Sequence, residues 1–274
     1  MSSPPWPANV TQVWERMSMK PRLVVFDVAG TTVRDDGDVV TEALLQAFAR
    51  FRLKVQREHI REHMGLAKQQ AIRLILRDSL EPSTLLHPRL LEAVHQDFLE
   101  TMCLYYAEHA EAIDGAEDTF SWLRAQGVAV VVDTGFPRRV LDAILSRLSW
   151  QDRGLISAAI ASDEVEFARP SPEMLRRAMR LSSVADSAWV TKVGDTPADL
   201  CEGLNGECGQ NIGVLWGSHD RASLERFPHT HLVEDWEELR AVLEGQSTSC
   251  FGLGAAASTS GRATVIEERE PARR

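Results

Sequence analysis

The sequence lacks the features that mark three common classes of protein. No run approaches the roughly 18 apolar residues that a membrane-spanning helix needs. A net charge of −10 and a pI near 5.3 argue against a protein that binds nucleic acid or an anionic membrane surface. The N-terminal stretch MSSPPWPANV has neither the basic region nor the apolar region of a secretory signal. These absences predict a soluble, cytoplasmic protein.

Informative cysteine spacing is also lacking. The four cysteines show neither a disulfide framework nor a zinc-binding pattern, and they are Cys103, Cys201, Cys208 and Cys250. For a cytoplasmic protein this predicts reduced thiols.

Regular patterning is missing at both ends of the chain. Residues 1–20 are rich in proline and serine and predict a flexible N-terminal extension. Residues 245–274 are small and polar and then charged without periodicity, which is typical of a disordered tail. Between these ends, a chain of 274 residues with 44% hydrophobic content is long enough to bury a substantial core.

Short apolar runs alternate with helical patterns through the middle of the chain. The runs are continuous rather than alternating in polarity, as expected for parallel strands buried on both faces of a sheet. Helical segments separate most of them, so the sequence predicts an α/β fold with a doubly wound, Rossmann-like parallel sheet. The predicted strands cover residues 22–27, 128–133, 156–161, 188–194, 211–215 and 230–233.

One long interval, residues 40–112, contains no convincing strand. Apolar residues there recur at i, i+3, i+4 and i+7, the spacing of one helix face: Leu44, Ala47, Phe48 and Phe51. We therefore expect an all-helical cap inserted into a core made of residues 21–39 and 113–244. Ligands bind at the carboxyl ends of strands in such sheets, so a cap inserted there would cover the site.

Two crossings between core and cap follow from this insertion, near residues 35–40 and 111–115. Gly37 and Gly115 lie in these crossings and are candidate hinge residues. We therefore expect a mobile cap.

Prolines follow three of the predicted strands where helices should begin. Proline suits the first helical position, where no N–H is needed, and the three are Pro137, Pro172 and Pro197. Thr196 with Asp199 forms a capping-box pattern, and Ser171 could cap the helix that Pro172 opens. Capping alone would explain Thr196 and Ser171.

Carboxylates end two of the predicted strands. Asp27 and Asp195 each follow an apolar run, where a buried carboxylate is unfavourable unless it is paired or bound to a metal. Two carboxylates converging at one edge of a sheet form a site of hard oxygen ligands that suits Mg²⁺, with water and a substrate phosphate completing the shell.

Phosphate-binding groups are expected in the same loops. Thr134 and the backbone N–H groups around Gly30 and Gly135 could cradle phosphate oxygens, and Arg169 could neutralise their charge. The predicted phosphate-binding residues are Gly30, Thr31, Thr134, Gly135 and Arg169.

These loops resemble the motif set of the haloacid dehalogenase superfamily over roughly residues 21–244. Asp27 opens the nucleophile motif as DVAGT, Thr134 matches the second motif, Arg169 matches the third, and GDTPAD matches the acidic fourth. The helical insert stands where the first cap type of this superfamily lies.

The resemblance implies a mechanism and a metal site. Asp27 would attack phosphorus and form an aspartyl-phosphate, which water would then hydrolyse. Mg²⁺ would bind between Asp27, the backbone carbonyl of Ala29 and Asp195, with Asp199 supporting the metal shell.

Ala29 stands where the superfamily's phosphatases have an aspartate that protonates the leaving group. Alanine cannot transfer a proton, so an ordinary phosphatase without this acid should lose about 10²–10⁴ in rate. One branch has alanine at this position. The phosphonatases, or phosphonoacetaldehyde hydrolases, carry D-x-A-G-T-T and cleave a P–C bond after a cap lysine forms a Schiff base with the substrate aldehyde.

A cap lysine of this kind is present. The phosphonatase segment M-G-L-x-K is similar to HMGLAKQQAI here, so Met64 and Lys68 fall on its positions. Lys68 should lie in the first turn of a helix and share a face with Ile72 and Ile75. A helix N-terminus and apolar neighbours both lower the pKa of an amine towards its neutral, nucleophilic form. The alternative is an ordinary helix lysine whose ammonium group reaches water.

The match to phosphonatases is incomplete in the auxiliary residues. The family's histidine three positions after the lysine is Ala71 here, and its tyrosine in the second motif is Phe136, which keeps the ring and loses the hydroxyl. Its cap-hinge cysteine has no counterpart in VRDDGDVV, and the glycine before the third-motif arginine is Ala168. This pattern indicates a phosphonatase-like subfamily.

Three functions therefore stay open at this point. The first is a Mg²⁺-dependent phosphonatase acting on phosphonoacetaldehyde or a close analogue. The second is a phosphatase for a small phosphate monoester, in which Lys68 only binds an anionic group. The third is a non-catalytic protein that binds a phosphorylated ligand. The resemblance also implies a homodimer formed through the cap.

Overall fold

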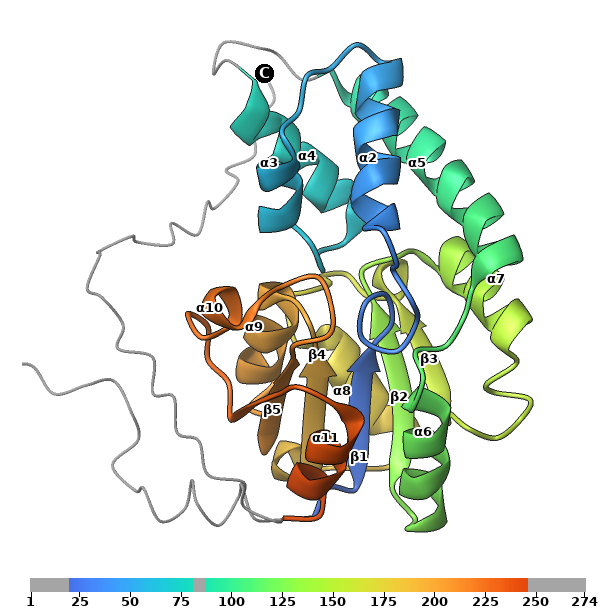
Figure 1. Ribbon diagram of the computed structural model, residues 1–274, viewed down its shortest axis with the longest axis vertical. Coiled ribbons are helices and arrows are strands. Elements are labelled where there is room, and N and C mark those ends of the chain that lie inside the picture. The colour runs from blue at the N-terminus through green and yellow to red at the C-terminus, as the bar shows by residue number, and fades with distance from the viewer. Residues whose placement is uncertain (1–19, 81–86, 246–274) are drawn as a thin grey trace, which may run out of the picture.

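The computed structural model describes residues 20–80 and 87–245, which form a parallel sheet with a layer of helices above one edge (Figure 1). The N-terminal extension and the C-terminal tail predicted from the sequence lie outside the described residues, apart from Lys20 and Gly245 at their borders.

Six parallel strands form the sheet in the order β3-β2-β1-β4-β5-β6. All six predicted strands are confirmed, with ends that differ by one or two residues. In the register of β1 and β2, Asp27 stands opposite Asp133, so neighbouring strands end in carboxylates at the same edge. The strands are β1 (Leu23–Asp27), β2 (Ala129–Thr134), β3 (Ala158–Ala161), β4 (Val190–Gly194), β5 (Gln210–Val214) and β6 (His231–Val233).

Side chains that alternate along the strands feed two separate apolar layers. On β1, Val24 and Phe26 belong to one cluster, whereas Leu23 and Val25 belong to another, and all four are fully buried. Burial on both faces explains why the strand sequences are continuously apolar.

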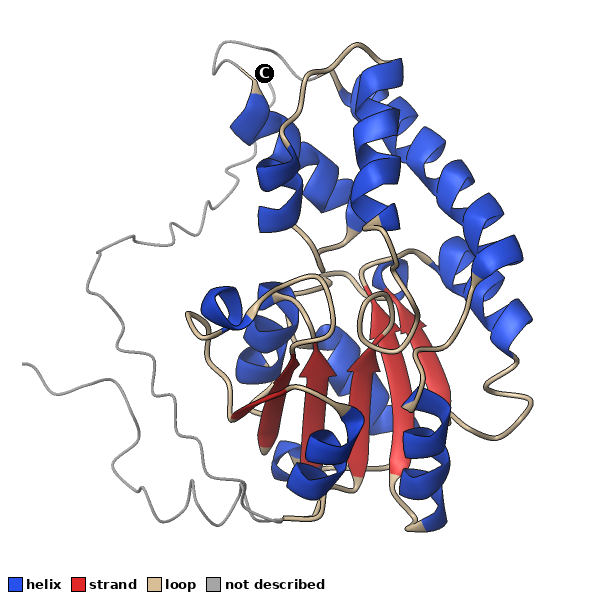
Figure 2. Ribbon diagram, viewed as in Figure 1, coloured by secondary structure: helices blue, strands red, loops and turns tan. Residues whose placement is uncertain are grey.

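Core helices cover both faces of the sheet (Figure 2). Helices α6, α7 and α11 pack on the Phe26 side, and α8 packs on the Val25 side. The core helices are α6 (Ala116–Ala125), α7 (Arg138–Leu148), α8 (Glu173–Leu181), α9 (Pro197–Asn205), α10 (Arg221–Leu224) and α11 (Trp236–Leu243).

Four further helices lie above the carboxyl ends of the strands (Figure 1). The apolar cluster on the Phe26 side continues into them, and the long helix α5 runs back towards the core along α7. The helix face predicted from Leu44, Ala47 and Phe48 is buried as expected. These helices are α2 (Val39–Arg50), α3 (Arg57–Glu62), α4 (Lys68–Ser79) and α5 (Pro88–His109).

The two crossings between core and cap lie side by side. Val33 and Ala112 form an antiparallel bridge, the Arg34 N–H donates to the Glu111 carbonyl (2.9 Å), and the Ile113 N–H donates to the Thr32 carbonyl (2.9 Å). The start and the end of the cap are therefore tied to each other beside the site.

Helix starts differ from the sequence prediction at two of the three prolines. Pro197 is the first residue of α9, and Thr196 and Asp199 form the predicted capping box. Pro137 and Pro172 instead stand one position earlier, at the N-caps of α7 and α8. The prediction that Ser171 caps α8 is wrong, because the cap position belongs to Pro172 and no side-chain cap bond is formed there.

Two of the expected absences can be checked within residues 20–80 and 87–245. No helix there is long and apolar enough to span a membrane. Cys103, Cys201 and Cys208 are free thiols, as expected, and Cys250 lies outside the described part of the chain.

Candidate active site

A small cavity lies between the carboxyl ends of the strands and the cap. The core contributes the loops after β1, β2, β4 and β5, and the cap contributes the loop before α4. Its volume is about 30 Å³, which suits one or two water molecules and is too small for a phosphoryl compound. The lining residues are Asp27, Ala29, Asp35, Val40, Met64, Gly65, Lys68, Thr134, Gly135, Phe136, Thr196 and Ser218.

Asp27 ends β1 at the floor of this cavity. Its carboxylate is 5% exposed, and its Oδ1 accepts a hydrogen bond from Arg169 Nη1 at 2.6 Å. Burial raises the pKa of Asp27 to about 7; Arg169 opposes this rise, and the neighbouring Asp199 and Asp195 add to it. A carboxylate with so raised a pKa needs further positive charge to stay ionised at neutral pH.

Beneath Asp27, two cations hold a cluster of fully buried acids. Arg169 forms ion pairs with Asp133, with Asp199 at 2.8 Å and with Glu202 at 3.0 Å. Lys192, from the middle of β4, contacts the same three acids. Arg169 is fully buried and does not line the cavity. A phosphate in the cavity could make the predicted contact with Arg169 only if the Asp27 carboxylate, which Arg169 contacts, did not stand between them.

The acids of this cluster differ in protonation. Burial raises the pKa of Asp133, but Arg169 and Lys192 outweigh it, so the pKa lies below its ordinary value. Burial and then the adjacent Asp133 raise the pKa of Glu202 to about 8. The pKa of Lys192 is raised because its three acid partners outweigh burial and Arg169. Glu202 is therefore the acid that holds a proton at neutral pH.

Asp195 lies next to Asp27 and has its own polar partners. Its Oδ1 accepts from the Thr31 hydroxyl (2.7 Å), and its Oδ2 accepts from the Ser218 N–H (2.8 Å) and hydroxyl (2.7 Å). Burial, followed by the charge of Asp199, raises the pKa of Asp195. Thr31 was predicted to bind phosphate, but its hydroxyl donates to Asp195 instead. Only the backbone of Thr31 is therefore left for a contact with phosphate.

The charges at this edge fit a divalent cation. Oxygens of Asp27, Asp195 and Asp199 come within 4.8 Å of one another. Five carboxyl groups, those of Asp27, Asp133, Asp195, Asp199 and Glu202, lie at this edge against two cations, Arg169 and Lys192. Carboxylate oxygens are the ligands that hard cations prefer. The residues predicted to bind a metal therefore do lie together, with Ala29 beside them in the cavity wall.

The predicted phosphate cradle is partly assembled. Thr134 and Gly135 line the cavity at the end of β2, and the Thr134 hydroxyl accepts from the Phe136 N–H at 3.2 Å. The Gly30 N–H donates to the Val33 carbonyl at 2.9 Å and is therefore engaged within its own loop. A phosphate cradle on this side must rely on N–H groups next to Gly30 rather than on its own.

Lys68 is the first residue of α4 and reaches the cavity from the cap. It is 5% exposed, its amine lies 4.9 Å from the centre of the Phe136 ring, and its backbone N–H donates to the Gly135 carbonyl at 3.2 Å. Ile72 and Ile75 are buried on the same helix, as the spacing predicted. Burial lowers the pKa of Lys68 to about 8, against an opposing effect of Asp27.

The chain contains only four lysines, Lys20, Lys54, Lys68 and Lys192. Two of them are buried, and their surroundings have opposite effects. Lys192 lies among carboxylates and has a raised pKa, whereas Lys68 lies among apolar groups and has a lowered one. Lys68 is therefore the buried amine that is partly neutral near physiological pH.

Sequence reasoning missed several residues of the site. Lys192 interrupts the apolar run of β4, and Asp133 is the last residue but one of β2; a charge within a buried strand is a signal that could have identified both. Glu202 and Asp35 carried no such signal, because a glutamate on a helix and an aspartate in a loop are ordinary surface residues.

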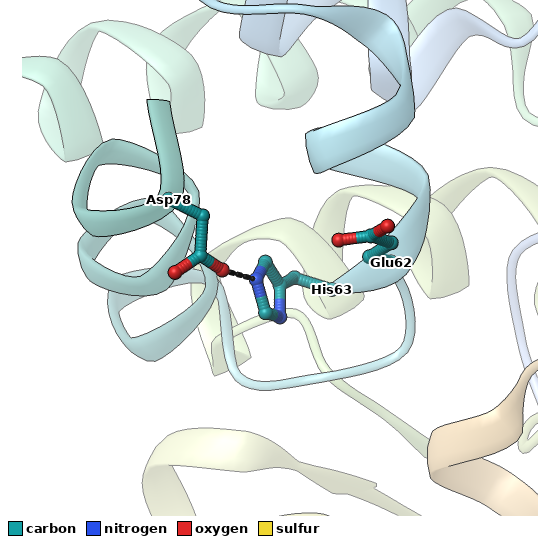
Figure 3. Close-up of side chains that lie close together, drawn as sticks. All are labelled: Glu62, His63 and Asp78. Carbon is teal, nitrogen blue, oxygen red and sulfur yellow. Dashed lines mark hydrogen bonds and ion pairs between the residues drawn. The ribbon is translucent and has the colours of Figure 1, made fainter. Parts of the chain in front are cut away.

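A separate group of possible metal ligands lies on the cap (Figure 3). His63 Nε2 is 2.7 Å from Asp78 Oδ2, the other oxygen of Asp78 accepts from Arg77 (2.8 Å), and Glu62 is exposed. His63 and Asp78 are already paired with each other, and none of the three residues lines the cavity.

Comparison with known proteins agrees with this geometry. The family of "haloacid dehalogenase-like hydrolase" matches residues 24–214. A phosphonoacetaldehyde hydrolase from Bordetella avium is 34% identical over 220 residues, which cover 77% of this chain and 77% of the relative.

Solved structures share the fold at lower identity. A phosphonoacetaldehyde hydrolase-like protein from Oleispira antarctica has a TM-score of 0.69 and 20% identity, covering 82% of this chain and 92% of the other. A predicted phosphoglycolate phosphatase from Haemophilus somnus has a TM-score of 0.66 and 15% identity, covering 82% and 98%.

Close contact between cap and core yields a first prediction. A Cβ at Gly65 would come 2.2 Å from the Thr196 hydroxyl, whereas one at Gly127 would meet nothing within 4 Å; both residues have positive φ (+80° and +75°). Each alanine substitution should therefore cost about 1–2 kcal/mol of stability through backbone strain. Only Gly65→Ala should displace the cap loop, with a loss of about 10²-fold in hydrolysis. Melting temperature and steady-state rates check this, and equal activity of the two variants would contradict it.

The buried charge cluster yields a second prediction. Lys192→Met should lower the free energy of unfolding by about 3–5 kcal/mol, because Asp133 and Glu202 stay buried with one cation fewer. Lys54→Met, at an exposed position, should change it by less than about 0.5 kcal/mol. Urea denaturation measures both values. A Lys192→Met protein as stable as the control would show that the cluster does not depend on this cation.

Proposed function

We propose a phosphonatase-type hydrolysis for this chain, which belongs to the haloacid dehalogenase-like hydrolases, in their phosphonatase-like branch. The substrate would be phosphonoacetaldehyde or a close analogue that combines a phosphonate with an aldehyde. The observation that carries the proposal is a buried amine of lowered pKa, Lys68, in the same cavity as a buried carboxylate, Asp27, with no proton donor at Ala29.

Asp27 is suited to the role of nucleophile. It lines the cavity, and Arg169 fixes its carboxylate from the opposite side. Asp27, Asp195 and the backbone carbonyl of Ala29 would hold Mg²⁺, with Asp199 in support. When bound, Mg²⁺ neutralises the excess negative charge and draws in the phosphonate oxygens. Asp27 would then attack phosphorus and carry the phosphoryl group until water releases it.

Lys68 supplies what Ala29 cannot. Cleavage of a P–C bond leaves an electron pair on carbon, which is unfavourable unless that pair can be delocalised. A neutral Lys68 amine can condense with the aldehyde, and the resulting cationic imine accepts the pair as an enamine. Such a leaving group needs no acid at position 29, so alanine there is compatible with full activity.

The size of the cavity supports a cap that opens. About 30 Å³ cannot admit a phosphonate, so the Lys68 loop must move away from Gly135 and Thr196 before the substrate binds. Gly37 and Gly115, which lie in the two crossings at positive φ (+81° and +96°), stay the proposed hinge positions.

A phosphatase acting on a small phosphate monoester is the second candidate. The observation in its favour is the apolar surroundings of Lys68: Ala71 and Phe136, both buried, offer no proton-transfer group to an imine. In this case Lys68 would bind an anionic part of the substrate, and its replacement by arginine would preserve most of the activity.

The decisive assay follows acetaldehyde and phosphate together with phosphonoacetaldehyde and Mg²⁺. We expect equal release of both products by the wild type and a loss of about 10³-fold or more in Lys68→Arg, because a guanidinium cannot form the imine. Lys54→Arg, in an exposed position of the cap, serves as the matched control and should keep full activity. Hydrolysis of phosphate esters without acetaldehyde release, little affected by Lys68→Arg, would favour the phosphatase instead.

Binding of Mg²⁺ should depend on pH because Asp27 has a raised pKa. Below about 7 its carboxyl holds a proton that the cation must displace, so affinity should rise by about tenfold per pH unit there and level off above. Calorimetric titration from pH 6 to pH 8 measures this, and Asp195→Asn should weaken binding at every pH. Equal dissociation constants at pH 6 and pH 8 would contradict the prediction.

A further inference from the structure

A second carboxylate lines the cavity and takes no part in the steps described so far. Among the lining residues, Asp27 and Asp35 carry carboxyl groups. Asp27 is committed to phosphorus, and Arg169 holds it. Asp35 stands in the first crossing between core and cap, and its Oδ1 accepts from the Val40 N–H at the start of α2 (3.2 Å). That bond orients its carboxyl group, and Asp35 and Lys68 line the same small cavity.

Charged groups from both the core and the cap act on the Asp35 carboxyl group. Burial raises its pKa to about 7, and Asp38 and Asp195 act in the same direction, whereas the Val40 N–H and Lys68 oppose the rise. Asp35 in turn raises the pKa of Lys68. The titratable groups that face it come from its own crossing, from β4, from α4 and from α5: Asp38, Asp195, Lys68, Tyr105 and Tyr106.

Imine chemistry at Lys68 requires an acid and a base. Addition of the amine to an aldehyde gives a carbinolamine, whose hydroxyl leaves only when it is protonated. After P–C cleavage the enamine takes up a proton on carbon from the solvent and becomes the product imine. Hydrolysis of that imine needs the reverse, a base that takes a proton from the attacking water. Ala71 and Phe136, which lie against Lys68, have no group that can do either.

We propose that Asp35 is the acid–base residue of the Lys68 reaction: its carboxyl group protonates the departing hydroxyl of the carbinolamine, and its carboxylate later accepts a proton from the water that hydrolyses the imine. The inference rests on the proposed function, since it needs an aldehyde substrate and an imine at Lys68.

Both steps balance with the groups present. In the first, the C–O bond breaks, oxygen leaves as water with the proton of Asp35, and the nitrogen lone pair forms the C=N bond of the cationic imine. In the second, water oxygen bonds to the imine carbon, its proton returns to Asp35, and the C=N electron pair returns to nitrogen. Asp35 ends protonated as it began.

The test separates imine formation from P–C cleavage by using acetaldehyde, which contains no phosphorus, as the probe. Wild-type protein with Mg²⁺ is treated with acetaldehyde and borohydride, and mass spectrometry of the Lys68 peptide gives the labelling rate between pH 5.5 and 9. Asp35→Asn keeps an oxygen acceptor for the Val40 N–H and removes the proton. Asp36→Asn is the matched control, because Asp36 is the neighbouring residue and its side chain is 78% exposed.

We expect the wild-type labelling rate to fall on the alkaline side of neutrality as Asp35 loses its proton, and we expect Asp35→Asn to slow labelling by about 10²-fold or more and to abolish that fall. Asp36→Asn should behave as the wild type, and Asp35→Glu, which restores a carboxyl group, should restore the alkaline fall. Loss of rate without any change in the pH profile would indicate a structural role and overturn the proposal.

The role of Asp35 and the proposed function can be refuted separately. If Lys68 is labelled at the same rate in the wild type and in Asp35→Asn, the role of Asp35 is overturned and the proposed function stays intact. No labelling of Lys68 in wild type would overturn the imine itself, and with it both proposals. Each protein's melting temperature, measured alongside, verifies that the variants are folded.

Discussion

Arg169 is the contact on which the rest of the site depends. Its guanidinium joins the carboxylate that ends β1 to the acids of β2 and α9, so one cation holds together three segments of the carboxyl edge. Lys192 contacts three of these acids as well, so two cations serve a larger number of buried carboxyl groups. Buried carboxylates that outnumber their cations are unfavourable, so the arrangement that holds the strand ends together also suits a divalent cation next to Asp27.

The cap brings a different electrostatic environment to the same cavity. Lys68 is buried without an ion-pair partner among the described residues, so burial lowers the pKa of its amine, whereas Lys192 keeps its charge among acids. Core and cap thus contribute opposite kinds of group, an anion that needs a metal and an amine that loses its proton. The proposed substrate, an aldehyde joined to a phosphonate, would offer one partner to each. Under that proposal, the absence of an acid at Ala29 follows from the chemistry of the leaving group.

The sequence predicted much of this arrangement, because its strongest signals are local. Continuous apolar runs identified all six strands, and the acids at the ends of β1 and β4 identified the edge where the carboxylates converge. The role of Glu202 could not be predicted, since it depends on contacts between elements distant in sequence, whereas Lys192 could have been recognised as a charge within a buried strand. Asp35 was missed for the same reason: only the closure of the cap brings its loop to Lys68. The prediction for Ser171 failed because α8 begins one residue later than expected, which places Pro172 at the N-cap.

The central claim, that burial makes the Lys68 amine partly neutral near physiological pH, can be tested directly through its ionisation. With lysine labelled by ¹³C at Cε, the four lysines give separate signals whose shifts report each amine as pH is varied. We predict that Lys68 titrates near pH 8, whereas Lys192 stays protonated to higher pH. A Lys68 signal that titrates only at the high pH of the Lys192 signal would contradict this claim.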